Sequence, residues 1–421
     1  MTIFKKLCFA AAVSALFVYP AETLTAADTL TWENALSALY SGNRQKIQSV
    51  SNISVYEQKV KAARGQLFPQ LSADGTFSKV DAYYNGAAES YSYGLSLNQP
   101  LFSPDKTAAL RESLSGLKQA VAEDRELDAE LSASLRAGFS ELKYAQQLAE
   151  LSENVQKRRE ANVDLIRLKY QAGRESKAAL LETQALAKSA AWEHERDLKN
   201  LVIAQRRLNQ LLGRDLLRPV KIDKSFDMPS PPKDFSAFSG LIEKHPALEA
   251  KIYAKEVSKA ETEIYRSNFK PTAKLFGEYN LNGSRWPDGV NDWALGVSVS
   301  WPLFAGGKNK ANLRAGMETL RKADTEILKT RDELYITAED DFLSWREAAS
   351  YLDVTDSMLE AVKERAWLVH RQYLSGEVTY FEWRDVETQL ADNQKNKLSA
   401  EKQLADAYTA FVKSVGQGEI K

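Results

Sequence analysis

The sequence has 421 residues, enough for two or three ordinary domains, and its formal net charge is −1. A chain so close to neutrality lacks the basic surface that binds nucleic acid, so we expect no nucleic-acid partner. Its only cysteine is Cys8, and no apolar stretch of about 18 residues or more predicts a helix that spans a membrane.

The N-terminus predicts a secretory signal peptide over residues 1–27. Lys5 and Lys6 form a positive region, residues 7–19 form an apolar segment too short to span a membrane, and Thr25-Ala26-Ala27 offers small residues for cleavage. Cys8 lies at the start of the apolar segment rather than after it, which argues against lipidation. The mature chain would then carry no thiol, which excludes disulfides, cysteine metal ligands and cysteine nucleophiles.

Residues 28–213 predict a first structural repeat. A helix from residue 30 to about residue 66 precedes two strands, at about 70–82 and 90–102, and a long helical hairpin follows at about 104–213. The first helix of this hairpin has no proline from residue 105 to residue 171, and its leucines are spaced by three and four residues as in a coiled coil. At 1.5 Å per residue it would reach ~100 Å.

Residues 214–236 predict a proline-rich linker, and residues 237–416 predict a second repeat of the same plan. Its strands are expected at about 272–283 and 291–304 and its helical hairpin at about 308–416, with a C-terminal tail at 417–421. The offset between Pro100 and Pro302 is 302 − 100 = 202, and that between Gly173 and Gly376 is 376 − 173 = 203. A register kept over ~170 residues indicates an internal duplication.

The second strand of each repeat alternates bulky apolar residues with small or polar ones. The expected apolar, lipid-facing side chains are Tyr91, Tyr93, Leu95 and Leu97 in the first repeat, and Trp293, Leu295, Val297, Val299 and Trp301 in the second. Period 2 indicates a strand with one apolar and one polar face, as in a transmembrane β-barrel. Taken alone, the pattern fits a sandwich strand packed on a protein core equally well; the rest of the chain favours the membrane.

Four strands cannot close a barrel in lipid, which tolerates no open sheet edge. Other copies of the same chain must therefore complete the sheet, and three copies would supply twelve strands around an open lumen.

The duplicated order helix–strand–strand–long helix–helix, with Pro-Leu-Phe at the strand ends and Tyr-x-x-Gly at the hairpin tips, resembles the TolC-like outer-membrane efflux and secretion channels. The resemblance covers nearly all of the mature chain. It implies a mixed α and β fold: a homotrimeric, 12-stranded transmembrane β-barrel that continues into a long periplasmic α-helical coiled-coil barrel. It also implies a Gram-negative-type outer membrane with its lipid, a periplasmic adaptor protein, and an inner-membrane efflux pump or ABC exporter as partners.

The resemblance places a gate at the hairpin tips. Glu382 and Asp385 are three residues apart, so they share a helix face, and they match acidic positions around the family's periplasmic mouth, where carboxylate rings attract cations. The first repeat keeps one acid there, Glu182. The alternative for each is an ordinary solvated helix charge.

Further gate contacts are expected from Tyr170 and Tyr373, for which packing at a helix interface is an equal alternative. A basic residue can follow the second tip glycine by two positions in the family; here that position holds Val378, and Arg174 is a possible substitute. Adaptor docking is expected at the two tips. The docking residues are Gly173, Ser176, Gly376 and Thr379.

No catalytic or metal-binding pattern is present in the sequence. His194, His245 and His370 are scattered, without the carboxylate spacing of a metal site, so we expect neither an enzyme nor a cofactor. Two rival hypotheses are a periplasmic adaptor and a structural coiled-coil protein, and matched amphipathic strand pairs argue against both. The substrate, whether drugs, metals or proteins, stays open.

Overall fold

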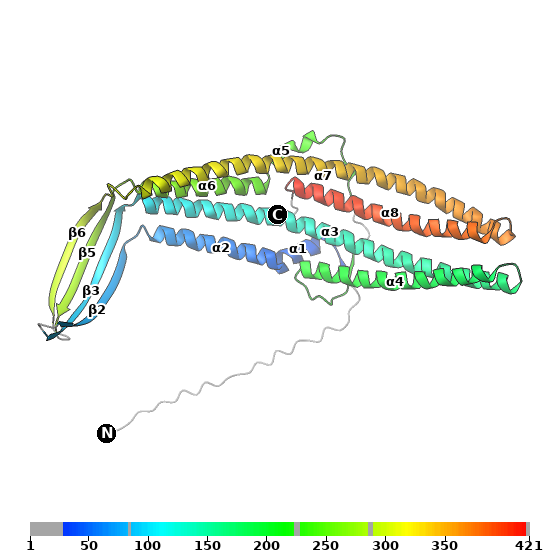
Figure 1. Ribbon diagram of the computed structural model, residues 1–421, viewed down its shortest axis with the longest axis horizontal. Helices are drawn as coiled ribbons and strands as arrows, with labels where there is room; N and C mark the ends of the chain where they lie inside the picture. The colour runs from blue at the N-terminus through cyan, green and yellow to red at the C-terminus, as the bar shows by residue number, and fades with distance from the viewer. Residues whose placement is uncertain (1–27, 83–85, 223–227, 285–288, 418–421) are drawn as a thin grey trace, which may run out of the picture.

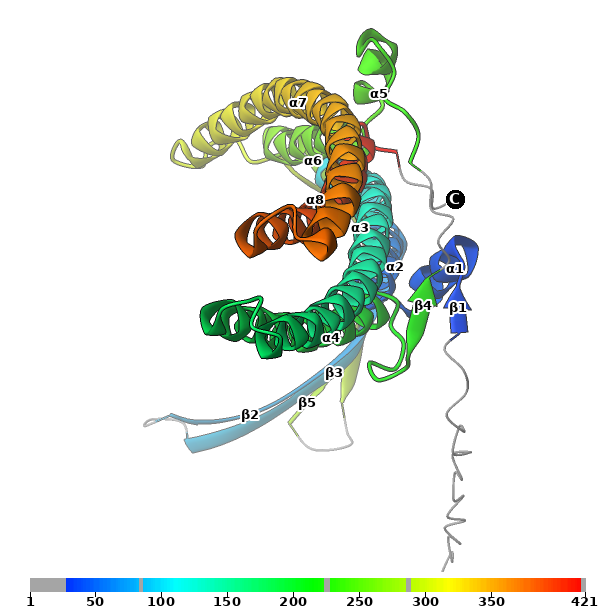
Figure 2. The ribbon, with the colours of Figure 1, turned by 90° about the vertical axis from the view of Figure 1, so that its right-hand side faces the viewer.

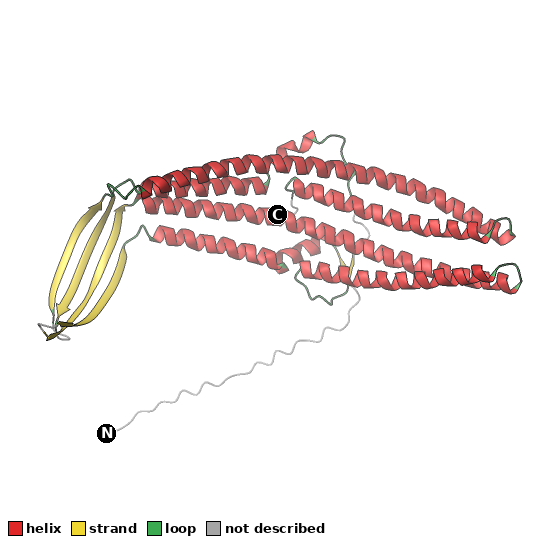
Figure 3. Ribbon diagram, in the orientation of Figure 1, coloured by secondary structure: helices red, strands yellow, loops and turns green. Residues whose placement is uncertain are grey.

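The computed structural model describes residues 28–82, 86–222, 228–284 and 289–417. The predicted signal peptide and most of the predicted C-terminal tail lie outside these residues. Each repeat contributes two long strands at one end of the molecule and a long helical hairpin that runs away from them (Figures 1 and 3).

The first repeat contains β1 (Asp28–Leu30), α1 (Trp32–Gly42), α2 (Arg44–Gly65), β2 (Gln70–Ala82), β3 (Gly86–Phe102), α3 (Pro104–Gln171) and α4 (Lys177–Leu211). The connection to the second repeat contains β4 (Val220–Ile222), a 3₁₀ turn η1 (Ser236–Phe238) and the short α5 (Ser239–Ile242). The second repeat contains α6 (Pro246–Ser267), β5 (Thr272–Gly283), β6 (Val290–Ser300), α7 (Lys308–Ser375) and α8 (Tyr380–Ser414). The duplicated plan predicted from the offsets is confirmed in its order of elements.

The helices form a single curved layer, four rods wide. α3 and α7, each 68 residues long, run its full length. α2 and α4 lie end to end along one side of α3, and α6 and α8 lie end to end between α3 and α7. Seen along the long axis, the layer is an arc, with α1, β1, β4 and α5 on its convex side (Figure 2). The rods in the middle of the arc belong to different repeats, so the repeats are not separable domains.

The expected single helix over residues 30–66 is wrong: a strand precedes it, and the helix breaks at Asn43. β1 pairs in parallel with β4. Asn43 is extended, its side chain accepts a hydrogen bond from the Lys46 amide at 3.0 Å, and its Nδ2 donates to the Leu211 carbonyl at 2.8 Å. An asparagine that caps a new helix while binding the end of α4 makes the chain turn here.

The four long strands form one antiparallel sheet in the order β2-β3-β5-β6. The register places Leu95 opposite Ala73 on one side and Tyr279 on the other, and Tyr279 opposite Trp293. Because side chains alternate between faces, most large apolar residues of the four strands lie on one face. The serines and Asn98 of the predicted strands lie on the other face, together with the apolar Phe276 and Val290. The alternation read from β3 and β6 therefore extends across the whole sheet.

Two strand boundaries differ from the expectation. β3 begins at Gly86 rather than near residue 90, and β6 ends at Ser300, so Trp301 is outside the strand. Pro302 has no backbone N–H to donate to the ladder, and the Trp301 indole N–H donates to the Phe269 carbonyl at 3.1 Å. No helix in the described part of the chain has the length and apolar character needed to cross a membrane.

Candidate functional site at the helical tips

Each hairpin reverses at a glycine in the left-handed region. Gly173 has φ +68° and Gly376 has φ +86°. The Gly376 amide donates to the Tyr373 carbonyl at 3.3 Å, and the amide of Glu377 donates to the Gln372 carbonyl at 2.8 Å. The amides of Gly173 and of the residue after it make the same two hydrogen bonds at the end of α3. These bonds satisfy the last carbonyls of α3 and α7, so both glycines serve the turns themselves.

The predicted docking residues Ser176 and Thr379 are helix N-caps. The Ser176 hydroxyl accepts from the Ala179 amide at 3.0 Å, and the Thr379 hydroxyl accepts from the Glu382 amide at 3.3 Å. Both residues are exposed at the ends of the molecule, although their hydroxyl oxygens already accept these capping hydrogen bonds.

Tyr373 forms the centre of a core that joins the two hairpins. Its ring, 1% exposed, stacks on Trp383 with centroids 4.6 Å apart and an interplanar angle of 6°. Ile166 from α3 and Ala179 from α4 complete the same cluster, and Val378 packs against it. Val378 therefore supplies apolar packing where the family can place a basic residue.

The polar atoms of Tyr373 also bind the first hairpin. Its hydroxyl donates to Glu175 Oε1 at 2.7 Å, and its carbonyl accepts from Lys169 Nζ at 2.7 Å. The Lys169 ammonium lies 3.7 Å from the centroid of the same ring. Burial, followed by the carboxylate of Glu175, raises the pKa of Tyr373, and burial lowers the pKa of Lys169. The predicted gate tyrosine is thus a buried contact between hairpins.

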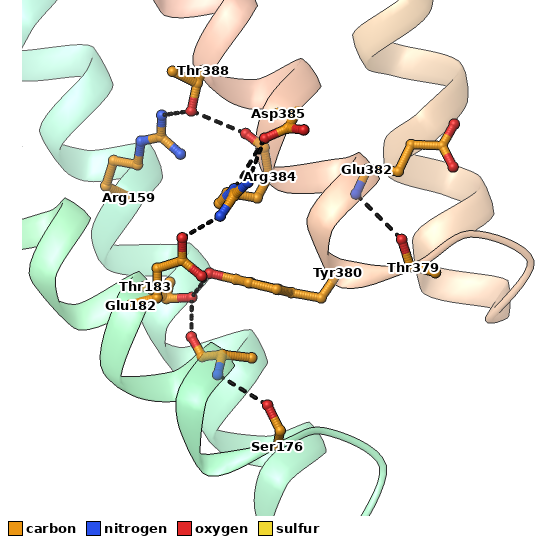
Figure 4. Close-up of polar contacts among 11 residues, drawn as sticks. Arg159, Ser176, Glu182, Thr183, Thr379, Tyr380, Glu382, Arg384, Asp385 and Thr388 are labelled. Atoms are coloured by element: carbon orange, nitrogen blue, oxygen red, sulfur yellow. Dashed lines mark hydrogen bonds and ion pairs between the residues drawn. The ribbon is translucent and has the colours of Figure 1, made fainter.

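Arg384 brings two of the predicted acids together. Its guanidinium forms an ion pair with Glu182 on α4 and binds Asp385 Oδ1 at 2.6 Å through Nη2 (Figure 4). The hydrogen bonds to Asp385 and Glu182 raise the pKa of Arg384. The pattern-based prediction did not single out this arginine, although a cation one residue before a predicted acid was a readable signal.

Glu382 is not part of this group. Its side chain is exposed and points away from Arg384 and Asp385 (Figure 4). Among the described residues it has no ion-pair partner within the chain. In the single chain, the spacing of three residues does not bring the two carboxylates together, and only Asp385 binds Arg384.

Tyr170 and Arg174 lie at the first tip without the predicted contacts. Tyr170 is 39% exposed, and Arg174 is exposed. Within the described ranges neither side chain has a hydrogen bond or ion pair to the second hairpin. In the single chain, contacts between the hairpins at the tip are made by Tyr373, which was also predicted, and by Arg384.

Further polar contacts join the hairpins above the tip. The Thr183 and Tyr380 hydroxyls are 2.9 Å apart, and Arg159 Nη2 donates to Thr388 Oγ1 at 3.1 Å (Figure 4). Burial lowers the pKa of Arg159. In the part of the chain that the structure describes, no cluster of three or more histidine, cysteine, aspartate or glutamate side chains forms a possible metal site.

The chain is duplicated, its long helical layer continues into an amphipathic sheet, and its two hairpins are joined at the far tips. These features together define a class of elongated membrane-associated proteins. The chain belongs to the outer membrane efflux protein family, whose model matches residues 36–214 and 238–417. Membership places it in the outer membrane of a Gram-negative-type cell, with the helices in the periplasm.

Individual relatives are distant. The chain is 26% identical to the alkaline protease secretion protein AprF of Pseudomonas aeruginosa over 271 residues, 61% of this chain and 54% of that protein. It is 22% identical to the outer membrane efflux protein BepC of Brucella suis over 343 residues, 79% of this chain and 74% of that protein. The match spans about half the length of AprF.

The fold matches solved structures over almost the whole chain. The crystal structure of the Campylobacter jejuni CmeC outer membrane channel superposes with a TM-score of 0.82 at 14% identity, covering 98% of this chain and 94% of that one. At this identity the match describes the fold.

Proposed function

We propose that the chain is the outer-membrane exit duct of a tripartite efflux or type I secretion system. It conducts substrate passively across the periplasm and the outer membrane, with a gate at the helical tips. The observation that carries the proposal is the sheet register, which gathers most large apolar residues of four strands on one face and leaves the opposite face mainly polar. Such a sheet fits between lipid and an aqueous lumen.

The active form is proposed to be a homotrimer. β2 and β6 are the two edges of the sheet, and lipid requires both edges to be paired. Pairing β2 of one copy with β6 of the next closes the sheet after three copies, with 3 × 4 = 12 strands. The curvature of the helical layer supports the same cyclic arrangement (Figure 2).

The outermost helices of the layer expose apolar side chains that support this assembly. On α4, Leu181, Trp192 and Ile203 are 55%, 61% and 43% exposed and spaced by eleven residues, which keeps them along one line of the helix. On α7 the exposed apolar residues include Ile336, Leu343, Tyr351, Val354 and Met358. A head-to-tail interface of α4 against the next copy's α7 would cover both sets.

The hairpin tips are proposed to dock a periplasmic adaptor, and through it an inner-membrane pump or ABC exporter. Gly173, Ser176, Gly376 and Thr379 are exposed there. AprF is named for protease secretion and BepC for efflux, so the relatives support both kinds of system. An adaptor or a pore-free coiled-coil protein is the alternative, and neither needs an amphipathic four-stranded sheet.

Single-channel conductance in planar bilayers tests the proposal. Wild type would be compared with Glu382→Ala/Asp385→Ala, with and without trivalent cations. We expect small pores that trivalent cations block, and a block that weakens in the variant because carboxylates at a narrow mouth bind cations. Equal block in wild type and variant would be consistent with a channel but would contradict the proposed acidic gate. Folded, membrane-extracted protein that forms no pores would favour the alternative.

A further inference from the structure

A cleft of about 300 Å³ lies where the sheet meets the helices, between the end of β3, the start of α3 and the end of α6. Its lining includes the apolar Leu101 and Phe102 and the charged Arg111, Glu263 and Lys270. It is far from the tips, and the gate described above makes no use of it.

The polar side of the cleft carries surplus positive charge. Arg111 and Lys270 are both exposed, and within the described residues neither has a carboxylate at ion-pair distance. The one acid in the lining, Glu263, pairs with Arg266 at 2.6 Å through that residue's Nη1. Two cations therefore face the cleft without a counter-charge from the chain.

The apolar side of the cleft is continuous with the apolar face of the sheet. A bulge at the end of β3 places Phe102 opposite Ala273, on the same face as Leu275 and Tyr279. Phe102 is 52% exposed and Leu101 is 58% exposed. Two unpaired cations thus lie directly beside an exposed apolar surface.

The second repeat does not reproduce this combination. At the offset of 202, the counterpart of Arg111 is 111 + 202 = 313, Leu313, and the counterpart of Lys270 is 270 − 202 = 68, Phe68. The duplicated fold therefore does not require cations at these positions.

We infer that this cleft binds the headgroup of an anionic phospholipid from the periplasmic leaflet of the outer membrane. The phosphate lies between Arg111 and Lys270, and the acyl chains run along Phe102 onto the apolar face of the sheet. A phospholipid presents an anion and hydrocarbon side by side, as the cleft requires, whereas free phosphate satisfies only the cations. The inference rests on the proposed function, because it needs the sheet to be in the membrane.

The test uses the full-length mature protein inserted into nanodiscs of phosphatidylcholine, with or without phosphatidylglycerol. Native mass spectrometry would measure how tightly phosphatidylglycerol is retained by wild type and by Arg111→Gln/Lys270→Gln. Each surface cation contributes about fivefold to the binding of an anionic lipid, so we expect about thirtyfold weaker retention in the double variant. Arg111→Lys/Lys270→Arg keeps the charge and should retain the lipid.

A matched control is Lys199→Gln/Arg206→Gln, which removes the same charge from exposed positions on α4 and should retain phosphatidylglycerol as wild type does. Excess inorganic phosphate should not displace the lipid; if it does, the cleft is a simple anion site and the inference is wrong. Protein that inserts but retains both lipids equally also overturns the inference and leaves the proposed channel intact. Wild-type protein that fails to insert into the nanodiscs overturns both the lipid-binding inference and the proposed channel.

Discussion

Arg384 sets the charge of the tip. Glu182, Glu382 and Asp385 alone would give −3 per chain, and the guanidinium that binds two of them reduces this to −3 + 1 = −2. The residue also connects the second hairpin to α4, so the charge of these four residues and the proposed closure depend on the same side chain. The proposed gate is therefore less acidic than its three carboxylates alone suggest.

Replacing Arg384 with leucine should strengthen cation block. Glu182 and Asp385 lose their shared cation, and the half-blocking concentration of a trivalent cation should fall about fivefold, which corresponds to ~1 kcal/mol. Single-channel recordings measure this. Arg174→Leu removes the same charge from the exposed first tip, and an equal effect there would contradict a role for the local ion pairs.

Removing the hydroxyl of Tyr373 should loosen the tip. Tyr373→Phe keeps the stack on Trp383 but loses the donor to Glu175, at a cost of about 1–2 kcal/mol. We expect a larger mean conductance than in wild type. Tyr170→Phe makes the same chemical change at an exposed tyrosine and should have no effect; if both variants conduct alike, Tyr373 is only a packing residue.

Alkaline pH should weaken the same contact. Because the pKa of Tyr373 is raised in the folded protein, its contribution to stability is fully present below the unfolded tyrosine value of about 10 and is lost as pH rises above it. Thermal unfolding of wild type should therefore shift more steeply above about pH 10 than that of Tyr373→Phe. Parallel curves would show that ionisation of this residue is not linked to stability.

At the scale of elements, a close backbone contact explains how the end of α4 packs against the end of α1. Gly213 follows α4 with φ +66°, and a Cβ on it would lie 1.9 Å from the Gly42 carbonyl oxygen. No side chain fits there, so the end of α4 can meet the end of α1 only through two glycines.

Gly213→Ala should therefore destabilise the protein more than Gly173→Ala. Gly173 has nearly the same φ, +68°, but open space around its Cβ position, so alanine there meets only the left-handed penalty of about 1 kcal/mol. At Gly213 the backbones must also separate, for a total of about 2–3 kcal/mol. Heat denaturation followed by circular dichroism measures both, and equal losses would mean that the contact is not tight.

The elements that the sequence predicted well are those with a repeating local signal. The 68-residue helices α3 and α7 and the alternation in β3 follow from spacing within the chain. β1 and β4 are three residues long and pair across some 190 positions, so no local pattern reveals them. The contact of Arg384 with Glu182 spans 202 residues and has no local signal either, although the arginine itself lies beside a predicted acid.

At the scale of the whole molecule, the single chain is incomplete. Its sheet has two open edges and its outermost helices expose apolar residues. The sequence offsets predicted the number of strands per chain. That the sheet must close with other copies follows because lipid tolerates no unpaired strand edge. Which surfaces of α4 and α7 meet depends on geometry between copies, which a single sequence does not contain.

A charge on the exposed line of α4 should prevent assembly. Trp192 is 61% exposed in the single chain, and Trp192→Asp should cost about 2 kcal/mol or more at each interface that buries it. Light scattering in detergent should then show smaller species than the trimer proposed for wild type. Asn200→Asp adds the same charge at an exposed polar position and should leave the trimer intact; loss of the trimer in both variants would mean that charge alone disrupts it.

The two open edges of the sheet also constrain the order of events in assembly. A lone chain offers β2 and β6 to any strand it meets, which makes early insertion or free diffusion an aggregation hazard. The helical hairpins form through contacts between neighbouring segments and need no partner to begin folding. If the helices associate first, they hold three sheets at high effective concentration before the strands pair. The helical layer would then act as a folding guide for the part of the molecule that enters the membrane.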